Sequence, residues 1–457
     1  MATKNEKKQA QPALGNDGIY DARSLGGGKM LVLGFQHLFA MFGATVLVPV
    51  LTGLSVSTTL LFAGFGTLLF HLLTKGKVPV FLGSSFAFLA AYFAFPNDGV
   101  TNLLPYACFG VACSSILYFI LAGLIRGFGV NRVMRFFPPV VTGPIIICIG
   151  LCLCGSALQN CNDNWWLALL ALAVIIVFNI WGKGMTKIIP VLLGVVVSYV
   201  VAAFTGNVDF TAVKEAAWLG LPSMENSLFS LAGNVDPGML VAAAFTIVPI
   251  SLATMTEHIG DICAISSTCN RNYLEDPGLH RTLLGDGVAT FVAAVFGAPA
   301  NTTYGENTGV LNLTKVYDPR VIRLAAIIAI ILSFCPKFSE LVHAMPVATL
   351  GGVSVILYGM ISAVGVRNVV ENNVDFTKSR NLIIAALIMV LSVGIKYGLE
   401  AEAIVFTIGE VTISLSGLAT GALVGVILNA ILPGKDYEFG QESKGAKAVN
   451  FQVGSRD

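Results

Sequence analysis

The stretch PANTTYGEN at residues 299–307 interrupts an apolar part of the chain, and it decides how the fold is interpreted. A proline, a glycine, a glutamate and four polar Asn and Thr residues within so short a run are poorly suited to a plain helix facing lipid. Non-helical backbone survives at membrane depth only where it is enclosed by protein or lines a wet cavity. The stretch therefore predicts an extended segment followed by a half-helix inside a membrane protein.

A second apolar segment, at residues 78–95, is interrupted in a similar way by a proline, a glycine and two serines. Pro79 lies 220 positions before Pro299, and Phe86 lies 220 positions before Glu306. Paired interrupted segments in corresponding places are typical of the substrate site of a secondary transporter. We expect the two half-helices to begin near Phe86 and Glu306 and to point unpaired N–H groups at a ligand.

Composition supports a membrane protein around these two segments. Of the 457 residues, 55% are hydrophobic and only 12% are charged, whereas soluble domains average roughly 25% charged residues. Apolar runs long enough to cross a bilayer recur along the chain, so we predict an all-α polytopic membrane protein with fourteen spans. The expected spans are 30–51, 57–74, 78–95, 103–125, 138–157, 165–181, 187–205, 239–258, 282–298, 300–314, 321–335, 346–364, 381–395 and 417–433.

The positions of Lys and Arg predict the orientation. An even number of spans puts both tails on one side, and that side carries all but three of the 27 Lys and Arg residues. By the positive-inside rule, we predict cytoplasmic tails at 1–29 and 434–457 and an extracellular loop at 206–238. The first tail lacks the apolar stretch of a signal peptide. The acids Glu400, Glu402 and Glu410 are assigned to another extracellular loop.

Short motifs recur between the two halves of the chain. Gln36-His37 in the first span is followed 221 positions later by Glu257-His258 in the eighth. The fifth span opens with PVVT at 139–142, and the twelfth opens with PVAT at 346–349. Together with the two interrupted segments, these motifs indicate two repeats of seven spans. Because seven is odd, the second repeat is inverted in the membrane.

Four carboxyl groups lie in the spans or beside them: Glu257, Asp261, Asp286 and Glu306. A carboxylate at mid-membrane costs about 2.5–3.5 kcal/mol, so such a residue usually has a function. Glu257 and Asp261 are four residues apart on one helix face and can share a proton. Asp261 can also cap a helix or face water, and Asp286, five residues after Arg281, can serve a structural role near the cytoplasmic edge.

Other function classes find little support in the sequence. The nine cysteines lie mostly in apolar runs and are interpreted as small buried residues rather than metal ligands or disulfides. No Ser-His pair, metal cluster or protease motif suggests an intramembrane enzyme, and no basic block suggests binding to nucleic acid. We therefore predict a transporter with no metal and no cofactor.

Five stretches resemble the nucleobase–ascorbate transporter family, most closely its bacterial members that carry uracil. The stretches are 36–49, 79–88, 257–260, 276–281 and 301–309. The resemblance covers nearly the whole chain outside the tails and implies a plasma-membrane protein, often a homodimer. It also implies a core domain, made of 30–126 and 239–335, and a gate domain, made of 132–205 and 346–433.

The resemblance also implies a nucleobase site between the two interrupted segments. Glu257 and Glu306 would accept hydrogen bonds from the base, and the backbone at Phe86 and Gly305 would contact it. Uracil carries two N–H donors and two carbonyl acceptors on a flat ring, which suits two carboxylates and two half-helix N-termini. Phe86 and Tyr304 would flank the ring, although Tyr304 can serve in packing alone.

Members of the family are proton symporters that work by alternating access, so the resemblance implies import of uracil together with protons. The best-known relatives that carry uracil have a histidine in place of Asp261, while other members have aspartate there and at the place of Asp286. The proton is therefore assigned to the set Glu257, Asp261, Asp286 and Glu306. The supporting residues, taken from the same motifs, are Gln36, His37, His258 and Asn307.

Two other substrate classes remain open. A purine such as xanthine or urate, or a broader range of nucleobases, is possible within the family, although purine carriers more often have glutamine at position 306. Inorganic anions and bicarbonate are carried by the same architecture. An anion site should keep positive charge at the two half-helices, where this chain has two acids.

Overall fold

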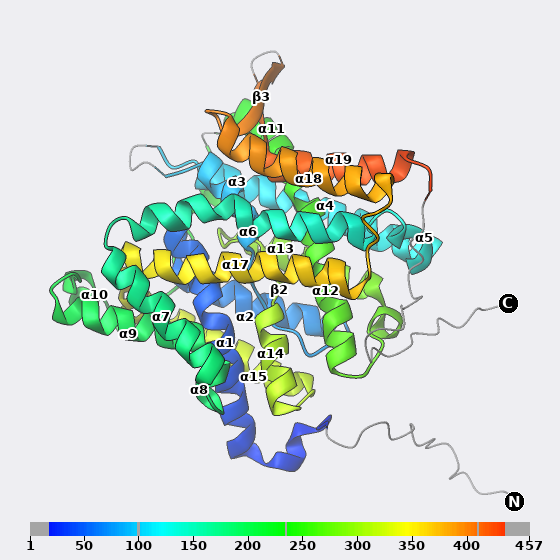
Figure 1. The fold of residues 1–457 in the computed structure, drawn as a ribbon. Coiled ribbons are helices and arrows are strands. Elements are labelled where there is room, and N and C mark those ends of the chain that lie inside the picture. Colours follow the sequence, from blue (N-terminus) through cyan, green and yellow to red (C-terminus); the bar gives the residue numbers. More distant parts are fainter. Residues whose placement is uncertain (1–17, 98–100, 234, 409–410, 435–457) are drawn as a thin grey trace, which may run out of the picture.

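The computed structural model describes residues 18–97, 101–233, 235–408 and 411–434, and these are mostly helical (Figure 1). Each uninterrupted span of the prediction contains at least one long helix. These helices are α1 (Gly27–Thr52), α2 (Val56–Leu73), α4 (Leu104–Phe128), α6 (Pro139–Cys161), α7 (Trp165–Trp181), α9 (Pro190–Phe204), α11 (Pro237–Ile247), α12 (Ser251–Thr268), α13 (Leu279–Val295), α15 (Pro319–Ser333), α17 (Val347–Glu371), α18 (Ser379–Gly398) and α19 (Gly417–Ile431).

Shorter helices join these long ones. They are η1 (Ala22–Leu25), α5 (Val130–Met134), α8 (Met185–Ile188), α10 (Thr211–Glu215), η3 (Leu228–Leu231), η4 (Val248–Ile250), η5 (Leu274–Gly278) and α16 (Pro336–His343). Within the described ranges, seven helical segments are long and apolar enough to cross a membrane, one of them being α11 continued into α12. The pair α15 and α16, bent by 89°, is an eighth candidate. The chain is thus a multi-pass membrane protein, and the fourteen crossings stay a prediction.

Polar side chains fix where several of the long helices begin. Ser55, Asn164, Asp236, Asp318 and Ser416 stand directly before α2, α7, α11, α15 and α19, and each accepts a hydrogen bond from a backbone N–H in the first turn. Such caps satisfy N–H groups that have no partner inside the helix. In an apolar surrounding these groups would otherwise be costly to bury.

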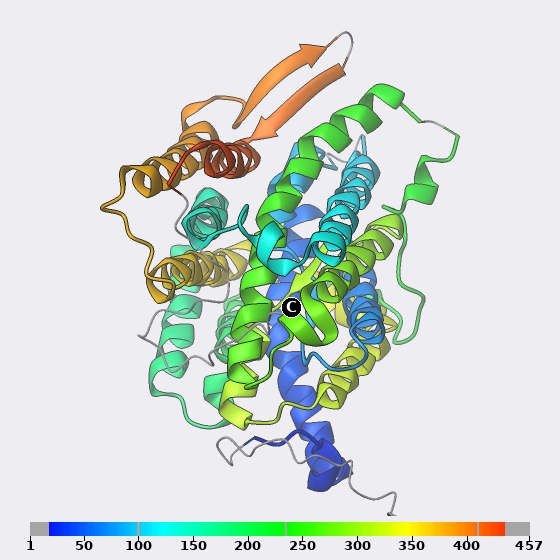
Figure 2. The same cartoon turned by 90° about the vertical axis from the view of Figure 1, so that its right-hand side faces the viewer.

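The long helices pack in two sets (Figures 1 and 2). In the first set, α13 lies against α4 and α2, and α15 lies against α2 and α1. In the second set, α17 runs along α6 and α7, and α18 lies against α19 and α6. In the first half of the chain α7 lies against α9, and in the second half α18 lies against α19. The expected division into a core domain and a gate domain stays a prediction. The inverted repeat and the relative movement of the sets remain proposals.

Two interrupted segments lie within the first set. The first segment consists of β1 (Leu82–Ser84), η2 (Phe86–Phe88) and α3 (Leu89–Ala94), and the second consists of β2 (Asn301–Thr303) and α14 (Gly305–Thr314). The two strands pair antiparallel with each other, although they are far apart in the sequence. All six strand residues are buried.

A β-hairpin follows Glu400 and Glu402, which lie in a turn as expected, and it is an exception to the all-α description. Glu410 lies outside the described residues. The strands of the hairpin, β3 (Ala403–Ile408) and β4 (Val411–Ser416), pair antiparallel and project from one end of the molecule (Figure 2). The hairpin joins α18 to α19 of the second set, yet β4 packs on α11, which lies against α4 and belongs to the first set. The Ser414 N–H donates to Thr246 Oγ1 of α11 at 3.3 Å. The hairpin therefore bridges the two sets.

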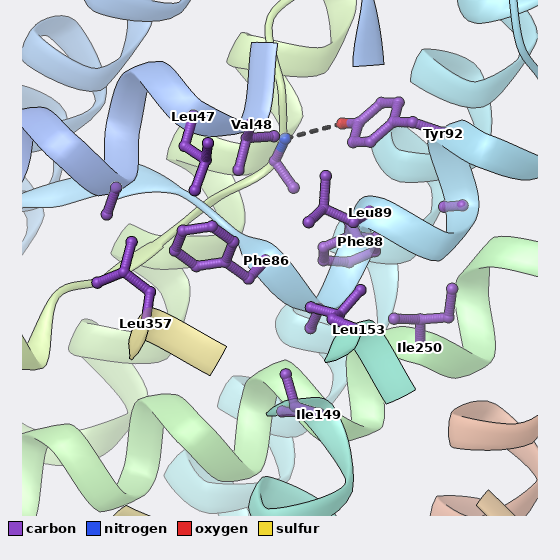
Figure 3. Packing of buried hydrophobic residues seen from close by; sticks show 14 of the residues in the cluster. Leu47, Val48, Phe86, Phe88, Leu89, Tyr92, Ile149, Leu153, Ile250 and Leu357 are labelled. Atoms are coloured by element: carbon purple, nitrogen blue, oxygen red, sulfur yellow. Dashed lines mark hydrogen bonds between the residues drawn. The ribbon is translucent and has the colours of Figure 1, made fainter. Parts of the chain in front are cut away.

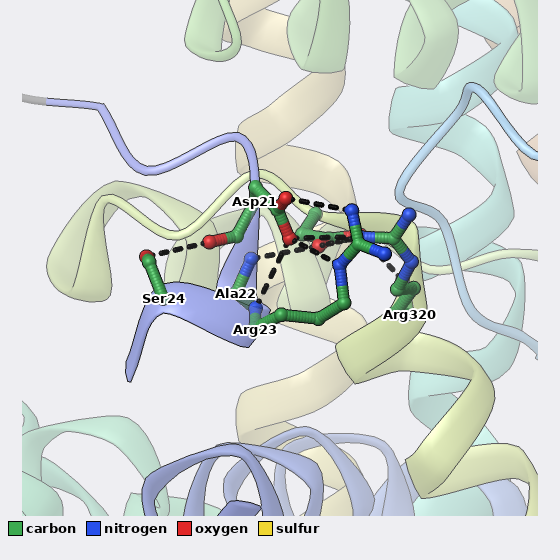
Figure 4. Close-up of polar contacts among 6 residues, drawn as sticks. Asp21, Ala22, Arg23, Ser24 and Arg320 are labelled. Atoms are coloured by element: carbon green, nitrogen blue, oxygen red, sulfur yellow. Dashed lines mark hydrogen bonds and ion pairs between the residues drawn. The ribbon is translucent and has the colours of Figure 1, made fainter. Parts of the chain in front are cut away.

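Part of the predicted tail at 1–29, residues 18–25, is packed against the rest of the chain. Ile19 forms a parallel bridge with Val316, and the Ala22 N–H donates to Asp318 Oδ2 at 2.7 Å. The guanidinium of Arg320 donates to Asp21 Oδ1 at 2.9 Å (Figure 4). A hydrogen bond from Arg23 holds the pKa of the Asp21 carboxyl well below its usual value. This segment ties the start of α1 to the turn between α14 and α15.

The expected loop at 206–238 also contains structure. It includes α10 and η3, and α11 already begins at Pro237. The Gly220 N–H donates to the Phe334 carbonyl, and the Lys337 N–H donates to the Ala217 carbonyl, both at 3.0 Å. Residues 435–457, nearly all of the expected C-terminal tail, lie outside the described residues.

Candidate substrate-binding site

The paired strands form the centre of the candidate site. Leu82 faces Thr303, Gly83 faces Thr302 and Ser84 faces Asn301 in the antiparallel register. The pairing extends by one hydrogen bond on each side, from Ser85 N–H to the Ala300 carbonyl at 2.8 Å and from Tyr304 N–H to the Phe81 carbonyl at 3.1 Å. The helical parts of the two segments therefore both start beside one buried two-stranded sheet.

Two tyrosine hydroxyls connect the segments, because each one forms a hydrogen bond with the backbone of the other segment. The hydroxyl of Tyr92, in α3, accepts a hydrogen bond from the Ala300 N–H at 2.9 Å. The hydroxyl of Tyr304 donates to the Ser84 carbonyl at 2.9 Å and lies 3.2 Å from Thr45 Oγ1 of α1. In this arrangement the Tyr304 hydroxyl holds β1 in place.

The strands are also anchored to the helices that precede them. Thr67 Oγ1 of α2 accepts from the Leu82 N–H at 2.9 Å, and Thr290 Oγ1 of α13 donates to the Asn301 carbonyl at 2.8 Å. The carboxamide of Asn301 donates to the carbonyl oxygens of Phe62 and Ala289. These bonds satisfy backbone and side-chain groups that are fully enclosed by protein.

Phe86 occupies the boundary between the two sets of helices. Its side chain is buried, and its ring meets that of Tyr358 of α17 edge to face at 5.7 Å between centroids. Figure 3 shows it among apolar residues from both sets, including Leu47 of α1, Leu153 of α6 and Leu357 of α17.

Next to Phe86 lies a small, partly open cavity of about 50 Å³. It is bounded by the first interrupted segment on one side and by α6, α18 and α19 on the other, and its lining includes Phe93, Ser156, Lys396 and Leu418. Lys396 forms an ion pair with Glu402, just before the hairpin. The cavity therefore lies between the two sets of helices, next to the candidate site.

The two acids of α12 lie near the second interrupted segment. Thr303 Oγ1 donates to Asp261 Oδ2 at 2.7 Å, so this carboxyl group reaches the end of β2. Glu257 is one helical turn earlier and is partly buried. Glu306 is the second residue of α14, and its side chain lies outside the description. The helix α12 packs against both β2 and α14, which brings the predicted acids to one region.

Asp286 is enclosed by protein. It lies about two turns inside α13 and is fully buried, and its expected place near the cytoplasmic edge stays a prediction. Its Oδ2 is 3.2 Å from Nδ1 of His258, which is also fully buried. This contact joins α12 to α13.

The predicted supporting residues of α1 lie in two different places. The Asn307 carboxamide of α14 is 3.1 Å from Nδ1 of His37 and donates to the His37 carbonyl at 3.2 Å. This contact ties α1 to α14 near the start of the half-helix. Gln36 contacts the Met185 sulfur of α8 instead, so the structure does not bring it to the strands.

No group of three His, Cys, Asp or Glu residues within the described ranges is placed to hold a metal ion. Three residues at the site were not among the predicted ones: Thr303, Tyr92 and Asn301. Each makes a polar contact to a segment that is distant in the sequence. Their residue types are common in helices and loops, so only the strand pairing reveals what they do.

Comparison with known proteins assigns the chain to a family. Residues 28–401 match the model of the permease family. A uracil permease of Bacillus caldolyticus is 40% identical over 417 residues, which cover 89% of this chain and 93% of that protein. Both the family model and this relative match most of the chain rather than a single motif, so they establish membership in the family.

Two solved transporter structures share the fold. The inward-facing murine anion transporter Solute Carrier 26 family member A9 has a TM-score of 0.58 at 12% identity, over 93% of this chain and 73% of its own. The transmembrane domain of the cyanobacterial bicarbonate transporter BicA has a TM-score of 0.56 at 16% identity, over 90% of this chain and 99% of its own. At these identities the likeness concerns the fold alone. By its sequence, the chain belongs to the permease family.

Proposed function

We propose that this protein imports uracil together with protons across the plasma membrane, with both termini in the cytoplasm. The main observation in favour of uracil as the substrate is the 40% identity to a uracil permease, which extends over 93% of that protein. The local structure is compatible with the same substrate, because α12, which carries Glu257 and Asp261, packs against β2 and α14, and β2 pairs with β1. The proposed unit is a homodimer.

The chemistry of the site suits a small flat base. Carboxylates at Glu257 and Glu306 accept from the ring N–H groups, and backbone N–H groups at Phe86 and Gly305 donate to its carbonyls. The ring of Phe86 covers one face of the base, and Tyr304 keeps the strands in place. A site built to hydrogen-bond each edge rejects bases that leave a buried partner unpaired.

The fold shared with bicarbonate and anion transporters supports a second candidate, an inorganic anion. Anion sites at helix N-termini depend on a positive surrounding. Here α12 presents Glu257 and Asp261 toward that region, and the side chain of Thr303 already donates to one of them. An anion would have to be held against these acids, so the neutral base is favoured.

Uptake into proteoliposomes tests the substrate directly. Radiolabelled uracil should accumulate, and unlabelled uracil should compete better than xanthine, urate, bicarbonate or sulfate. Strong competition by xanthine without competition by uracil would assign the protein to the purine carriers. Competition by bicarbonate alone would favour the anion candidate.

The proposed coupling ion is the proton. The acids Glu257, Asp261, Asp286 and Glu306 are the candidate carriers, and a close pair of acids titrates as a unit rather than as two separate groups. An inward-negative membrane potential then favours import by about 2.3 kcal/mol for each proton charge and each 100 mV of potential. Uptake should rise as the external pH falls and should collapse with a protonophore. Uptake that requires Na⁺ and ignores pH would contradict proton symport.

Alternating access is proposed as movement of the first set of helices against the second. The contact between Ser414 of the hairpin and Thr246 of α11 joins the two sets. A disulfide between Thr246→Cys and Ser414→Cys, in a background without native cysteines, should block uptake reversibly and leave uracil binding intact. A disulfide between Val405→Cys and Ser414→Cys is the matched control, because those positions face each other within the hairpin. Full uptake by the oxidised Thr246–Ser414 variant would contradict the proposed movement.

A further inference from the structure

Thr303 contacts Asp261, one of the candidate proton carriers. It is the last residue of β2, its side chain is buried, and its hydroxyl donates to Asp261 Oδ2 at 2.7 Å. The other carboxyl oxygen, Oδ1, lies 3.5 Å from the point where a β-carbon on Gly305 would stand. The carboxyl of Asp261 is thus held where β2 ends and α14 begins.

The hydrogen bond has a direction that matters for proton coupling. A threonine hydroxyl has one hydrogen, and here it is donated to the Asp261 carboxylate. A hydrogen bond to the charged form favours that form over the protonated one, and such charge-assisted bonds are stronger than neutral ones. When Asp261 takes up a proton on Oδ2, the hydroxyl must turn and accept instead. Protonation of Asp261 therefore changes a bond that also fixes the end of β2.

We propose that Thr303 is a positioning residue that sets the pH range over which the protein couples protons to transport. It acts through Asp261 and does not itself touch the substrate. By tying the Asp261 carboxyl to the break between β2 and α14, it links the protonation of this acid to the position of Gly305 and Glu306. The proposal rests on the proposed proton symport and names a residue that regulates it.

Other groups around α12 contribute to the electrostatics of Asp261. The helix itself carries Glu257 and His258, and α14 carries Glu306. His258 pairs with Asp286 of α13, and α4 contributes Tyr118, whose hydroxyl bonds Thr254 of α12. The neighbouring α6 and α19 contain no Asp, Glu, Lys, Arg or His. Among the described side chains, Thr303 is nevertheless the one that reaches Asp261 from β2.

The same strand provides a matched control. Thr302 is buried next to Thr303 and has the same chemistry, but its hydroxyl has no hydrogen-bond partner among the described residues. Replacing either threonine with valine removes one buried hydroxyl from β2. Only the change at Thr303 removes a donor to Asp261. Thr303→Ser keeps the donor while changing the side-chain volume.

The experiment compares the pH dependence of uracil uptake in proteoliposomes. Loss of a charge-assisted donor makes the carboxylate of Asp261 less stable, so Asp261 takes up a proton at higher pH. In Thr303→Val the midpoint of uptake against external pH should move about one unit to higher pH, a tenfold change in proton affinity. Thr303→Ser and Thr302→Val should keep the wild-type midpoint. In an Asp261→Asn background, Thr303→Val should cause no further shift.

A readout without transport separates this proposal from the proposed function. The carboxyl C=O infrared band that Asp261→Asn removes should appear, on acidification, at higher pH in purified Thr303→Val than in the wild type. That shift supports the role of Thr303 even if uracil proves not to be the substrate. An unchanged midpoint of this band in Thr303→Val would overturn the proposal, and so would an equal shift in Thr302→Val. Failure of wild-type uracil uptake would overturn only the proposed function.

Discussion

The two interrupted segments follow the same backbone plan and differ in their chemistry. Each has a three-residue strand followed by a helical stretch, each strand is bonded by a threonine of the preceding helix, and each segment sends one tyrosine hydroxyl to the other. After the strand, however, the first segment reads FAFLAAYFA at 86–94, while the second reads GENTGVLNLT at 305–314. The plan is shared, whereas the polar groups are concentrated in the second segment.

The surroundings of the segments explain this division. The first segment lies at the boundary between the two sets of helices, where Phe86 contacts α17 and the cavity beside it is mostly apolar. The second segment faces α12 and α1, which present Asp261 and His37. An apolar wall can slide over a neighbouring surface without breaking hydrogen bonds, whereas a polar wall can hold a ligand. In the proposed cycle, therefore, the first segment provides the moving surface and the second provides recognition.

The largest expected effect concerns the polar side of the comparison. Glu257→Ala and Glu306→Ala should each weaken uracil binding at least about 100-fold, because a buried N–H of the base loses its acceptor at a cost of about 3 kcal/mol. Phe86→Ala should weaken binding only about tenfold, since it removes one ring face. Isothermal titration calorimetry of purified variants measures all three.

Glu371→Ala is the control for these substitutions, because its side chain is exposed and pairs only with Arg367 among the described partners. It should bind uracil like the wild type. If Phe86→Ala costs as much binding as Glu257→Ala, the division between an apolar and a polar segment is wrong.

A smaller effect concerns how tightly each segment is packed. A β-carbon on Gly83 would lie 2.5 Å from the ring of Tyr304 and 2.6 Å from Thr45 Oγ1, whereas one on Gly305 would meet Asp261 Oδ1 at 3.5 Å, an ordinary contact. Gly83→Ala should therefore lower the free energy of unfolding by about 1–3 kcal/mol. Gly305→Ala should change it by less than about 0.5 kcal/mol. Thermal unfolding in detergent compares the two, and equal shifts would show that the packing around the segments is alike.

The smallest expected difference is between the two tyrosine contacts. Tyr304→Phe removes the donor to the buried Ser84 carbonyl and a neighbour of Thr45, and it should lower the free energy of unfolding by about 1–2 kcal/mol. Tyr92→Phe removes only the acceptor for the Ala300 N–H and should cost about 1 kcal/mol. The same unfolding measurement ranks them. A larger loss in Tyr92→Phe would mean that the first segment depends less on its partner than the second does.

The helical spans could be predicted from the sequence because lipid imposes a simple requirement. Backbone groups inside a bilayer need internal partners, so apolar runs of sufficient length become helices. The interrupted segments were visible for the converse reason, since Pro299 and the polar residues after it disfavour a helix in lipid. The acids of α12 were visible because charge is costly in such surroundings.

The parts that were missed depend on contacts between distant residues. Three-residue strands are too short to show an alternating pattern, so neither the register of β1 with β2 nor the bond from Thr303 to Asp261 could be predicted. The packing of residues 18–25 depends on a turn about 300 positions later. The hairpin at 403–416 did carry a signal, because two runs rich in β-branched residues flank its turn. The acids around it led to the expectation of a plain loop.

The pairing of β1 with β2 has a consequence for biosynthesis. Gly83 and Thr302 are partners across 219 positions of sequence, so the ribosome must complete the first half and about a third of the second half before the first strand finds its hydrogen bonds. Until then, the nascent chain holds an extended stretch with unpaired backbone groups, which lipid cannot satisfy. The insertion machinery or the neighbouring helices must shelter that stretch during synthesis. Closure of this small sheet, rather than insertion of any single helix, would complete the candidate binding site.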